Sequence, residues 1–434
     1  MIRLFKVSIP SSAVVLVISE AVLLFSCYLF AAWLTIDIPL VRFLFEQGGY
    51  WHIAFVVAVI MLGLYFNDLY EHYQVRSRIE LAQQFCLALG VAFLLQSLMS
   101  YAHWGILLPK YAMVYGSVLA LILCPLWRMC FNALASSSLG AEKLLFLGVS
   151  PAVREIASYL SQHPEYRLAL LGYLDSSSEI PGMTKLGTFH QLDDVLAEQQ
   201  PSRVVVGLDP LAPASLPVER LLELRLAGLE IEEASATYEM VFRRVSTRDL
   251  PLSHLIFSKE MSPRASSVTF QSAYSLVLGL AALVLMLPVM TAVALMVKLT
   301  SGGPLLQRER CAGLNGAPFS VLKFRSTAKW LRRLHLDGLP QLFNVMRGDM
   351  AMVGPRPERP EFAAVLEEEI PYYRQRLCVK PGITGWAQIN EKGSGEVEDT
   401  IQKLEFDRYY IKNLSPALDV YIMFHALKTT LLGR

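Results

Sequence analysis

Long uninterrupted runs of apolar residues constrain this chain more than any other feature of its sequence. Four of them occupy the first 131 residues, at 7–34, 51–66, 81–101 and 111–129. Each approaches the roughly 20 residues that an α-helix needs to cross a bilayer. The first run is too long, and has too little of a cleavage-site pattern, to be a removable signal peptide. The sequence therefore predicts a region of four transmembrane helices at residues 1–135.

The composition agrees with a membrane protein. Apolar residues make up 53% of the 434 residues and charged residues only 18%, below the quarter or so (about 25%) that is usual in soluble domains. The net charge of +1 provides no basic field for nucleic acid, and the chain has no basic module with interleaved aromatic residues. The six cysteines are scattered without paired spacing, so neither a disulfide framework nor a zinc site is expected. The sequence thus predicts no nucleic-acid partner.

Basic residues beside the apolar runs predict which side of the membrane each end faces. Those at the N-terminus, between the second and third runs, and at or after the end of the fourth run are Arg3, Lys6, Arg76, Arg78, Arg128 and Lys143. The loops on the other side carry only Arg42 and Lys110. Because positive charges stay on the cytoplasmic side, the N-terminus and everything after the fourth run are expected in the cytoplasm. Glu20, inside the first run, is either a functional carboxylate or a helix-packing residue.

Residues 142–262 have the pattern of a soluble α/β domain. Buried strands are predicted at L-L-F-L-G-V-S, at L-A-L-L-G-Y-L-D and at 203–207, with an amphipathic helix at 153–162. Strands that alternate with helices predict a Rossmann-like parallel sheet. Gly148 and Asp175 suit a nucleotide site, but the further glycines of the fingerprint are absent. A structural or regulatory domain is expected, with a nucleotide-binding domain as the alternative.

The fifth apolar run, at 268–299, is predicted to enter the membrane and return to the same side. Pro288 near its middle removes a backbone donor and kinks the helix. Basic residues stand on both flanks, at Lys259, Arg264, Lys298, Arg308 and Arg310. Both flanks are therefore expected in the cytoplasm, which predicts a re-entrant helix. The alternative is a fifth complete span, which would export the rest of the chain.

Three segments after this run are dense in arginine, glycine and proline. They are Q-R-E-R-C-A-G-L-N-G-A-P-F-S-V-L-K-F-R-S-T, L-R-R-L-H-L-D-G-L-P-Q-L-F-N-V-M-R-G-D-M and V-G-P-R-P-E-R-P-E-F. Cations beside a membrane helix indicate either a phosphate site at the bilayer surface or a basic face for anionic lipid headgroups. Arg356 stands between two prolines that fix the local backbone, so its guanidinium is suited to fork onto phosphate oxygens. The phosphate site is the favoured interpretation.

Asp337 is a single carboxylate among Arg325, Arg332 and Arg333. The positive charges favour its ionised form, which can attack phosphorus and form an aspartyl phosphate. A salt bridge or a helix cap is the alternative role. A pyrophosphate donor would also need Mg²⁺, which one or two carboxylates and water molecules hold. The candidate carboxylates are Asp337, Asp349, Glu358 and Asp419.

These segments, together with V-K-P-G-I-T-G-W-A-Q-I at 379–389 and K-L-E-F-D-R-Y-Y-I-K-N-L-S-P-A-L-D-V-Y-I near the C-terminus, resemble the bacterial sugar transferase family. The whole chain resembles the large form of its monotopic phosphoglycosyl transferases. V-G-P-R-P-E-R-P-E-F particularly resembles exopolysaccharide members associated with exosortase-type systems. The resemblance implies a membrane α plus α/β fold: four transmembrane helices at 1–135, a Rossmann-like middle domain at 142–262, and an α-rich catalytic domain at 268–434 with a re-entrant helix at 268–299.

The resemblance implies transfer of a sugar 1-phosphate from a UDP-sugar to undecaprenyl phosphate, the first membrane step of exopolysaccharide or O-antigen synthesis. It implies a multi-pass protein of the bacterial inner (cytoplasmic) membrane, in contact with membrane lipid, whose catalytic domain faces the cytoplasm. The large form also suggests a homodimer that associates through the middle domain. Which sugar is transferred does not follow from the sequence.

The resemblance also assigns roles to single residues. Asp337 matches the nucleophile, and Arg332 matches an arginine shortly before it. Lys323, Arg325 and Arg356 match phosphate-binding residues. The C-terminal acid near the site corresponds to Asp419, which with Asp337 is expected to bind Mg²⁺.

Two positions and one segment depart from the family's pattern. Leu287 replaces the serine before Pro288, Gly338 replaces a glutamate that follows the nucleophile, and residues 326–331 replace a longer segment. A catalytically degenerate member that acts as a binding or regulatory protein is therefore the alternative function. Glu358 and Glu361 are the candidates to supply the missing carboxylate. Trp386 is expected to be an interfacial anchor or a substrate contact.

Overall fold

The computed structural model describes residues 2–4, 7–9, 11–66, 70, 78–102, 108–135, 142–163, 166, 168–175, 180–207, 216–247, 263, 265–300, 304–325, 331, 336–370, 372–390 and 397–432. The chain divides into two compact units. One comprises Met1–Ile2, Ile9–Lys143 and Leu160–Ala169, and the other Arg3–Ser8, Leu144–Tyr159 and Leu170–Arg434.

Each of the four N-terminal apolar runs forms a helix, as predicted. After the paired short strands β1 (Ile2–Leu4) and β2 (Val7–Ile9) come α1 (Ser11–Thr35), α2 (Leu40–Phe45), α3 (Gly49–Phe66), α4 (Arg78–Ala102) and α5 (Lys110–Ala135). α1 packs against α3 and α5 through a shared apolar core. In the described part of this region, three helical segments are long and apolar enough to cross a membrane: Val14–Thr35, Gly49–Phe66 and Lys110–Phe131. α4 carries a shorter apolar stretch, Gln83–Ser97.

A buried ion pair joins α1 to α5. Arg128 Nη2 donates to Glu20 Oε2 at 2.9 Å, and a second bond joins Arg128 Nε to Glu20 Oε1. The Tyr70 hydroxyl donates to the same carboxylate at 2.8 Å. Both charged side chains are buried, which supports the helix-packing role for Glu20. Arg128 is therefore no cytoplasmic flanking charge, and the predicted orientation depends on the other basic residues.

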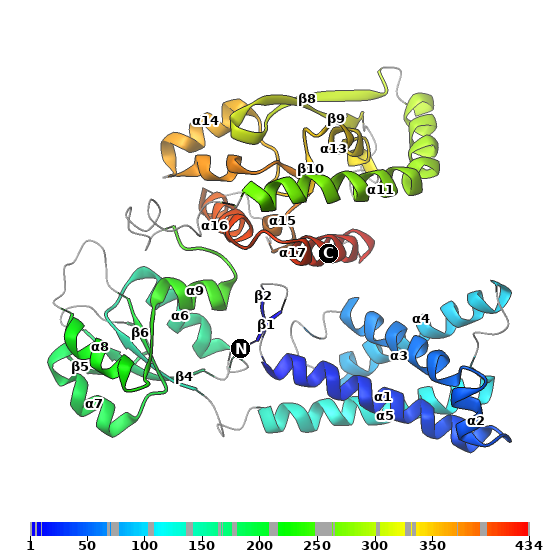
Figure 1. Ribbon diagram of the computed structural model, residues 1–434, viewed down its shortest axis with the longest axis horizontal. Coiled ribbons are helices and arrows are strands. Elements are labelled where there is room, and N and C mark those ends of the chain that lie inside the picture. Colours follow the sequence, from blue (N-terminus) through cyan, green and yellow to red (C-terminus); the bar gives the residue numbers. More distant parts are fainter. Residues whose placement is uncertain are drawn as a thin grey trace. The chain divides into compact units, whose positions relative to one another are not determined.

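The middle domain is built on a five-stranded sheet of order β5-β4-β3-β6-β7. Its pairs β3–β6, β6–β7 and β4–β5 are parallel, as predicted. Leucines and valines of β3 and β6 form a core with α7 and α8 on one face, and Figure 1 shows α6 and α9 on the other. The elements are β3 (Glu142–Leu147), α6 (Pro151–Gln162), β4 (Leu168–Leu174), β5 (Lys185–Gly187), η3 (Phe189–Gln191), α7 (Leu192–Gln199), β6 (Arg203–Val206), α8 (Val218–Leu226), β7 (Glu230–Glu233) and α9 (Ala234–Phe242).

The switch point of this sheet lies between β3 and β6, where ligands of such folds usually bind. Gly148 and Gly207 follow these two strands. A Cβ added at Gly207 would lie 2.2 Å from Val153 Cγ2 and 3.1 Å from Ser150 Oγ. The two loops are thus packed against each other, which supports the structural role expected from the incomplete glycine fingerprint.

The C-terminal domain combines short strands with several helices. Its strands pair as an antiparallel hairpin, β8–β9, and as a parallel pair, β10–β11. Asn344 fixes α13 to the hairpin, because its side chain donates to Ser320 O at 2.8 Å and accepts from Leu322 N at 3.0 Å. The elements are α11 (Ala265–Thr300), β8 (Leu306–Ala312), η4 (Leu314–Gly316), β9 (Pro318–Phe324), η5 (Leu336–Gly338), α13 (Gln341–Arg347), β10 (Ala351–Val353), α14 (Pro360–Glu369), η6 (Tyr373–Cys378), β11 (Gly382–Thr384), α15 (Trp386–Asn390), α16 (Val397–Asn413) and α17 (Pro416–Leu432).

α11 is the fifth apolar run, and Figure 1 shows that it bends sharply before it leads to β8. Pro288 lies inside the helix, and the Thr291 hydroxyl donates to its carbonyl at 2.8 Å. A proline is the usual cause of such a bend, because it removes one helical hydrogen bond. Large apolar side chains on α11 are exposed, among them Val277, Val284, Leu285, Leu295 and Leu299.

Both halves of α11 pack against the same C-terminal domain. In the first half, a Cβ at Gly279 would lie 2.9 Å from Val345 Cγ1 of α13. In the second half, Val293 and Val297 join the apolar cluster that contains Phe324 and Leu342. The helix therefore follows the domain on both sides of its bend.

A buried polar group fixes the first half of α11 to β10. Gln271 Nε2 of α11 donates to Val353 O at 3.0 Å and to Asp419 Oδ2 of α17 at 3.1 Å. Tyr274 also donates to Asp419 Oδ2, and Tyr410 donates to Oδ1 at 2.8 Å. These bonds join α11, β10, α16 and α17 at one point directly before the segment that carries Arg356.

α9 and the residues after it connect the sheet of the middle domain to α16. Lys412 Nζ contacts Glu239 Oε2 at 2.8 Å, and Thr247 N donates to Glu405 Oε1 at 2.8 Å. Burial raises the pKa of Glu405, although the bonds from Thr247 and the charge of Arg244 act in the opposite direction. These contacts order the end of the middle domain on the C-terminal domain.

The Glu20–Arg128 pair gives a prediction for stability. Arg128→Met should lower the free energy of unfolding by about 3–5 kcal/mol, because it leaves a buried carboxylate without its countercharge. Combining it with Glu20→Gln should cost less than the sum of the two single substitutions. Tryptophan fluorescence during thermal unfolding in detergent measures these changes. The control is Arg42→Met, which removes an exposed pair with Glu46 and should change little; an equal loss there would contradict the prediction.

Asp419 gives a prediction for pH. Burial raises its pKa from 3.8 to about 6, against the lowering by the bonds from Tyr274, Tyr410 and Gln271. The folded state then binds this proton more tightly than the unfolded chain, so the group's contribution to stability falls as the pH rises through this window, by about 3 kcal/mol in all. In unfolding measured from pH 4 to 7 with a metal chelator present, Asp419→Asn should lose less stability than the wild type. The exposed control Glu369→Gln should follow the wild type; identical slopes for all three proteins would refute the expectation.

Candidate functional site

The three motif segments meet around one apolar cluster beside α11. Phe324 lies between Lys323 and Arg325, and Leu336 and Leu339 lie on either side of Asp337 and Gly338. Met352 of β10 precedes Arg356. These apolar neighbours pack with the second half of α11 in a cluster that includes Met290, Val293, Val297, Phe324, Leu336, Leu339, Leu342 and Met352. The cluster explains how segments far apart in sequence are held near the same end of the membrane helix.

Asp337 lies on η5, which packs against β9 and leads through Pro340 into α13. Its side chain is half-buried. Within the residues that the structure describes, its carboxylate makes no hydrogen bond or ion pair. This position suits a carboxylate that must approach a ligand. Arg332 and Arg333, predicted to surround it, lie outside the described residues.

Lys323, in β9, and Arg325, directly after this strand, lie in different environments. Lys323 Nζ pairs with Glu309 Oε2 at 2.9 Å, and Arg359 Nε pairs with Glu309 Oε1 at 2.6 Å. Hydrogen bonds from Lys323 and Arg359 lower the pKa of Glu309. Arg325 is exposed, and its side chain has no hydrogen bond or ion pair to other described residues. Of these two cations, Lys323 is thus paired, and the side chain of Arg325 is unpaired among the described residues.

The pairing of Glu309 with Lys323 was not predicted from the sequence. β8 and β9 form an antiparallel hairpin in which Gln307 pairs with Lys323 and Glu309 with Val321. Gln307 and Glu309 are two residues apart on β8, so their side chains share a face of the hairpin. Because Gln307 is the cross-strand partner of Lys323, Glu309 and Lys323 lie on that same face. Once the hairpin was recognised, this alternation was the available signal.

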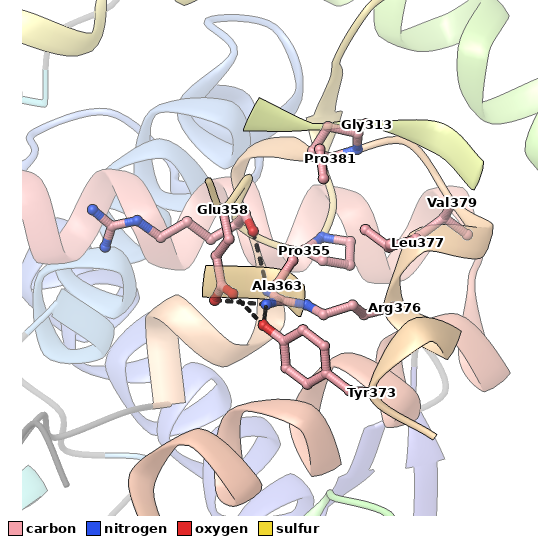
Figure 2. A pocket seen from close by; sticks show the side chains of 11 residues that line it. Gly313, Pro355, Glu358, Ala363, Tyr373, Arg376, Leu377, Val379 and Pro381 are labelled. Atoms are coloured by element: carbon pink, nitrogen blue, oxygen red, sulfur yellow. Dashed lines mark hydrogen bonds and ion pairs between the residues drawn. The ribbon is translucent and has the colours of Figure 1, made fainter. Parts of the chain in front are cut away.

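Arg356 lies in the turn after β10 and is exposed, as a ligand-binding arginine should be. Beneath the turn is a small cavity lined by Ala312, Gly313, Pro355, Arg356, Glu358, Ala363, Tyr373, Arg376, Leu377, Val379 and Pro381. Figure 2 shows that the side chains of Glu358, Tyr373 and Arg376 point toward one another. Arg376 Nη1 pairs with Glu358 Oε1 at 2.6 Å.

Glu358 is therefore already committed to other side chains. Besides Arg376, its carboxylate accepts a bond from the Tyr373 hydroxyl. Glu361, the other candidate for the carboxylate absent at Gly338, is exposed in the first turn of α14. In this conformation neither residue is shown beside Asp337.

Asp419 is 1% exposed, and both of its oxygens accept hydrogen bonds from Gln271, Tyr274 and Tyr410. This environment fixes β10 on α11. A role of Asp419 in binding Mg²⁺ stays a prediction, as does the role of Asp337. Among the described residues no group of three or more His, Cys, Asp and Glu side chains could hold a metal ion. Mg²⁺ is commonly held by one or two carboxylates, with phosphate and water oxygens as its other ligands.

The expectation for Trp386 is wrong. Its side chain is 1% exposed, its ring stacks on Tyr409 at 5.6 Å between centroids, and Nε1 donates to Arg243 O at 2.9 Å. It is therefore neither an interfacial anchor nor positioned to contact a ligand. It is a packing residue that holds the segment after α9.

Two families match the chain. The family described as bacterial sugar transferase matches residues 266–329 and 326–433, and a CoA-binding domain family matches residues 65–212. The sugar transferase match covers α11 and every motif segment around Asp337. The middle-domain match includes β3, α6, β4, β5, α7 and β6.

Individual relatives agree with the C-terminal match. A UDP-N-acetylgalactosamine-undecaprenyl-phosphate N-acetylgalactosaminephosphotransferase of Aeromonas hydrophila is 39% identical over 168 residues, which are 34% of this chain and 40% of that protein. A UDP-glucose:undecaprenyl-phosphate glucose-1-phosphate transferase of Xanthomonas campestris pv. campestris is 28% identical over 331 residues, 69% of this chain and 68% of that protein.

An exopolysaccharide production protein PSS of Rhizobium leguminosarum bv. phaseoli is 34% identical over 187 residues, 36% of this chain and 92% of that protein. The chain thus spans nearly all of this relative but well under half of the Aeromonas protein. The match to almost the full length of a relative, together with the ordered motifs around Asp337, shows that the chain belongs to the bacterial sugar transferase family.

Proposed function

We propose that this protein transfers a sugar 1-phosphate from a UDP-sugar to undecaprenyl phosphate through an aspartyl phosphosugar intermediate on Asp337. The observation that carries the proposal is the convergence of the Lys323–Arg325, Asp337 and Arg356 segments on one apolar cluster beside α11. The Aeromonas and Xanthomonas relatives are named as transferases of this kind to undecaprenyl phosphate, which supports the same substrate classes here. Exopolysaccharide or O-antigen synthesis is the proposed pathway class.

In the first half-reaction, a carboxylate oxygen of Asp337 attacks the phosphorus that carries the sugar. The bond from this phosphorus to the bridging oxygen breaks, and UMP leaves with the electron pair. Arg325 and Arg356 are exposed, and their guanidinium groups make no bond to other described residues, which suits them to bind phosphate oxygens. Lys323, held by Glu309, adds a positive charge.

In the second half-reaction, a phosphate oxygen of undecaprenyl phosphate attacks the same phosphorus and releases the Asp337 carboxylate. The position of the cluster against α11 supports access for a lipid substrate, because α11 exposes large apolar side chains. Arg332 is proposed to act beside the nucleophile. Mg²⁺, when bound by Asp337 and the donor phosphates, spreads the charge of the pyrophosphate.

We also propose that α11 is re-entrant and that the C-terminal domain faces the cytoplasm of the inner membrane. A straight helix over the 34-residue apolar segment Ser266–Leu299 would be about 51 Å long, well beyond the roughly 30 Å of a hydrocarbon core. The bend and the contacts of both halves with one domain support entry and exit on one side. A homodimer through the middle domain remains part of the proposal; α8 supports it by exposing Val218, Leu222 and Leu226.

A second candidate function follows from Gly338. Without the glutamate of the family's pattern, the protein would bind phosphosugars and lipid without turnover, as a binding or regulatory protein. Release of UMP by purified protein with undecaprenyl phosphate, Mg²⁺ and a panel of UDP-sugars distinguishes the two functions. No release with any sugar would favour the second.

Asp337→Asn should abolish UMP release, by about a thousandfold or more, because the amide cannot act as the nucleophile. The covalent phosphosugar adduct, detected by mass spectrometry of the intact protein, should disappear as well. Glu369→Gln, an exposed carboxylate on α14, is the matched control and should keep both signals. Retained turnover in Asp337→Asn would refute the assigned nucleophile.

Gly338→Glu should raise the rate of UMP release about tenfold if the absence of a second carboxylate is the only defect of the site. The substitution fits, because a Cβ at Gly338 would meet only the flexible end of Gln341, at 3.1 Å from Nε2. It should also lower the Mg²⁺ concentration needed for half-maximal rate. Gly338→Gln has the same shape without the charge and should give no gain; an equal gain in both variants would contradict the explanation.

A further inference from the structure

We propose that Arg376 is a positioning residue for the phosphate site: it holds the carbonyl of Arg356 and thereby fixes the turn that presents the Arg356 guanidinium. This inference rests on the proposed function, since it assigns Arg356 to phosphate. Arg376 lies on η6, outside the motif segments from which the phosphate site was predicted. It reaches the turn from a different part of the domain.

The turn around Arg356 is held mostly by backbone bonds. Gly354 N donates to Thr384 O at 2.9 Å, Gly382 N donates to Pro355 O at 3.0 Å, and Ala312 N donates to Glu358 O at 2.8 Å. These bonds anchor both ends of the turn to β11 and to the end of β8. They do not involve the carbonyl of Arg356 itself.

That carbonyl is bound by a side chain instead. Arg376 Nη2 donates to Arg356 O at 3.1 Å. The prolines on either side of Arg356 fix their own φ angles, but they do not set the direction of the peptide carbonyl between them. The bond from Arg376 supplies this missing constraint at the residue whose side chain is needed for phosphate.

Arg376 is itself rigid. Its side chain is 5% exposed, and its two terminal nitrogens face four acceptors. Nη1 pairs with Glu358 at 2.6 Å and donates to the Tyr373 hydroxyl; Nη2 pairs with Asp407 of α16 at 3.0 Å in addition to Arg356 O. Burial opposes the charge, but Asp407 and Glu358 outweigh it and raise the pKa of Arg376.

This arrangement holds the backbone of Arg356 while its side chain stays exposed. A guanidinium whose backbone is already fixed loses less freedom when it binds, so affinity and orientation both improve. A lysine at 376 would keep a positive charge but could not reproduce the planar fork that reaches two carboxylates and a carbonyl. Arg376→Lys should therefore lower the affinity for the phosphate ligand.

The experiment is a double-mutant cycle on the full-length protein in detergent. Arg376→Lys, Arg356→Ala and the double variant are compared with the wild type, and affinity for UMP is measured by calorimetry. Arg376→Lys alone should weaken UMP binding about tenfold, whereas in the Arg356→Ala background it should change the affinity less than twofold. Equal losses in both backgrounds would overturn the proposal, because Arg376 would then not act through Arg356.

Arg374→Lys is the matched control. Arg374 is an exposed residue of η6, the 3-10 helix that also carries Arg376, and its Nε atom lies 3.9 Å from Glu367 Oε1. Its substitution should leave the affinity for UMP unchanged. If Arg376→Lys does not fold, as judged by thermal unfolding, Tyr373→Phe replaces it in the cycle. Tyr373→Phe removes one partner of Arg376 and should give the same non-additive pattern with a smaller loss.

Turnover separates this inference from the proposed function. With an active donor sugar, Arg376→Lys should raise the KM for the UDP-sugar about tenfold and change kcat less, while the midpoint of thermal unfolding stays near the wild type. Wild-type protein that binds UMP but releases none from any UDP-sugar would sink the proposed function and leave the binding cycle to decide the inference. A loss in kcat alone, with unchanged KM and UMP affinity, would sink the inference and leave the proposed function intact.

Discussion

The hydrogen bonds around the buried Asp419 carboxylate set the position of α11 on the C-terminal domain. Apolar contacts along such a helix are not directional, so they stabilise many rotations and translations about equally. Gln271 and Tyr274 favour one position, because displaced donors would leave the buried Oδ2 atom of Asp419 without its hydrogen bonds. The strand that precedes Arg356 and the helix proposed to enter the membrane are thereby aligned. The cluster that holds the Asp337 segment depends on the same alignment, since Met352 of β10 belongs to it.

Much of the fold follows from the sequence, because apolar run length and periodicity are local signals. The helices α1, α3, α4, α5 and α11 and the parallel sheet of the middle domain all formed where the pattern predicted them. The motif segments also singled out Asp337 and Arg356 as candidate site residues, and their roles stay predictions. That the segments around them share one apolar cluster is a finding of the structure.

The contacts that organise the site could not be predicted in the same way, because they join residues far apart in the chain. Glu309 pairs with Lys323 only because of the hairpin register, and Arg376 meets Asp407 across two helices. Trp386 was expected to anchor at the membrane interface or to contact substrate, but its ring stacks on Tyr409 and its indole nitrogen donates to Arg243 O. A sequence shows which side chains carry charge and not which charges are already neutralised.

α16 carries two acidic residues whose partners lie in different parts of the protein. Glu405 bonds to Thr247 after α9, while Asp407 pairs with Arg376 beneath the turn of Arg356. Two residues apart on a helix, these side chains point in nearly opposite directions, about 200° around the axis. A rigid helix cannot turn one of them without moving the other. The segment after α9 and the residue that holds the carbonyl of Arg356 are therefore anchored to the same helix, so any displacement of α16 would move both anchors together.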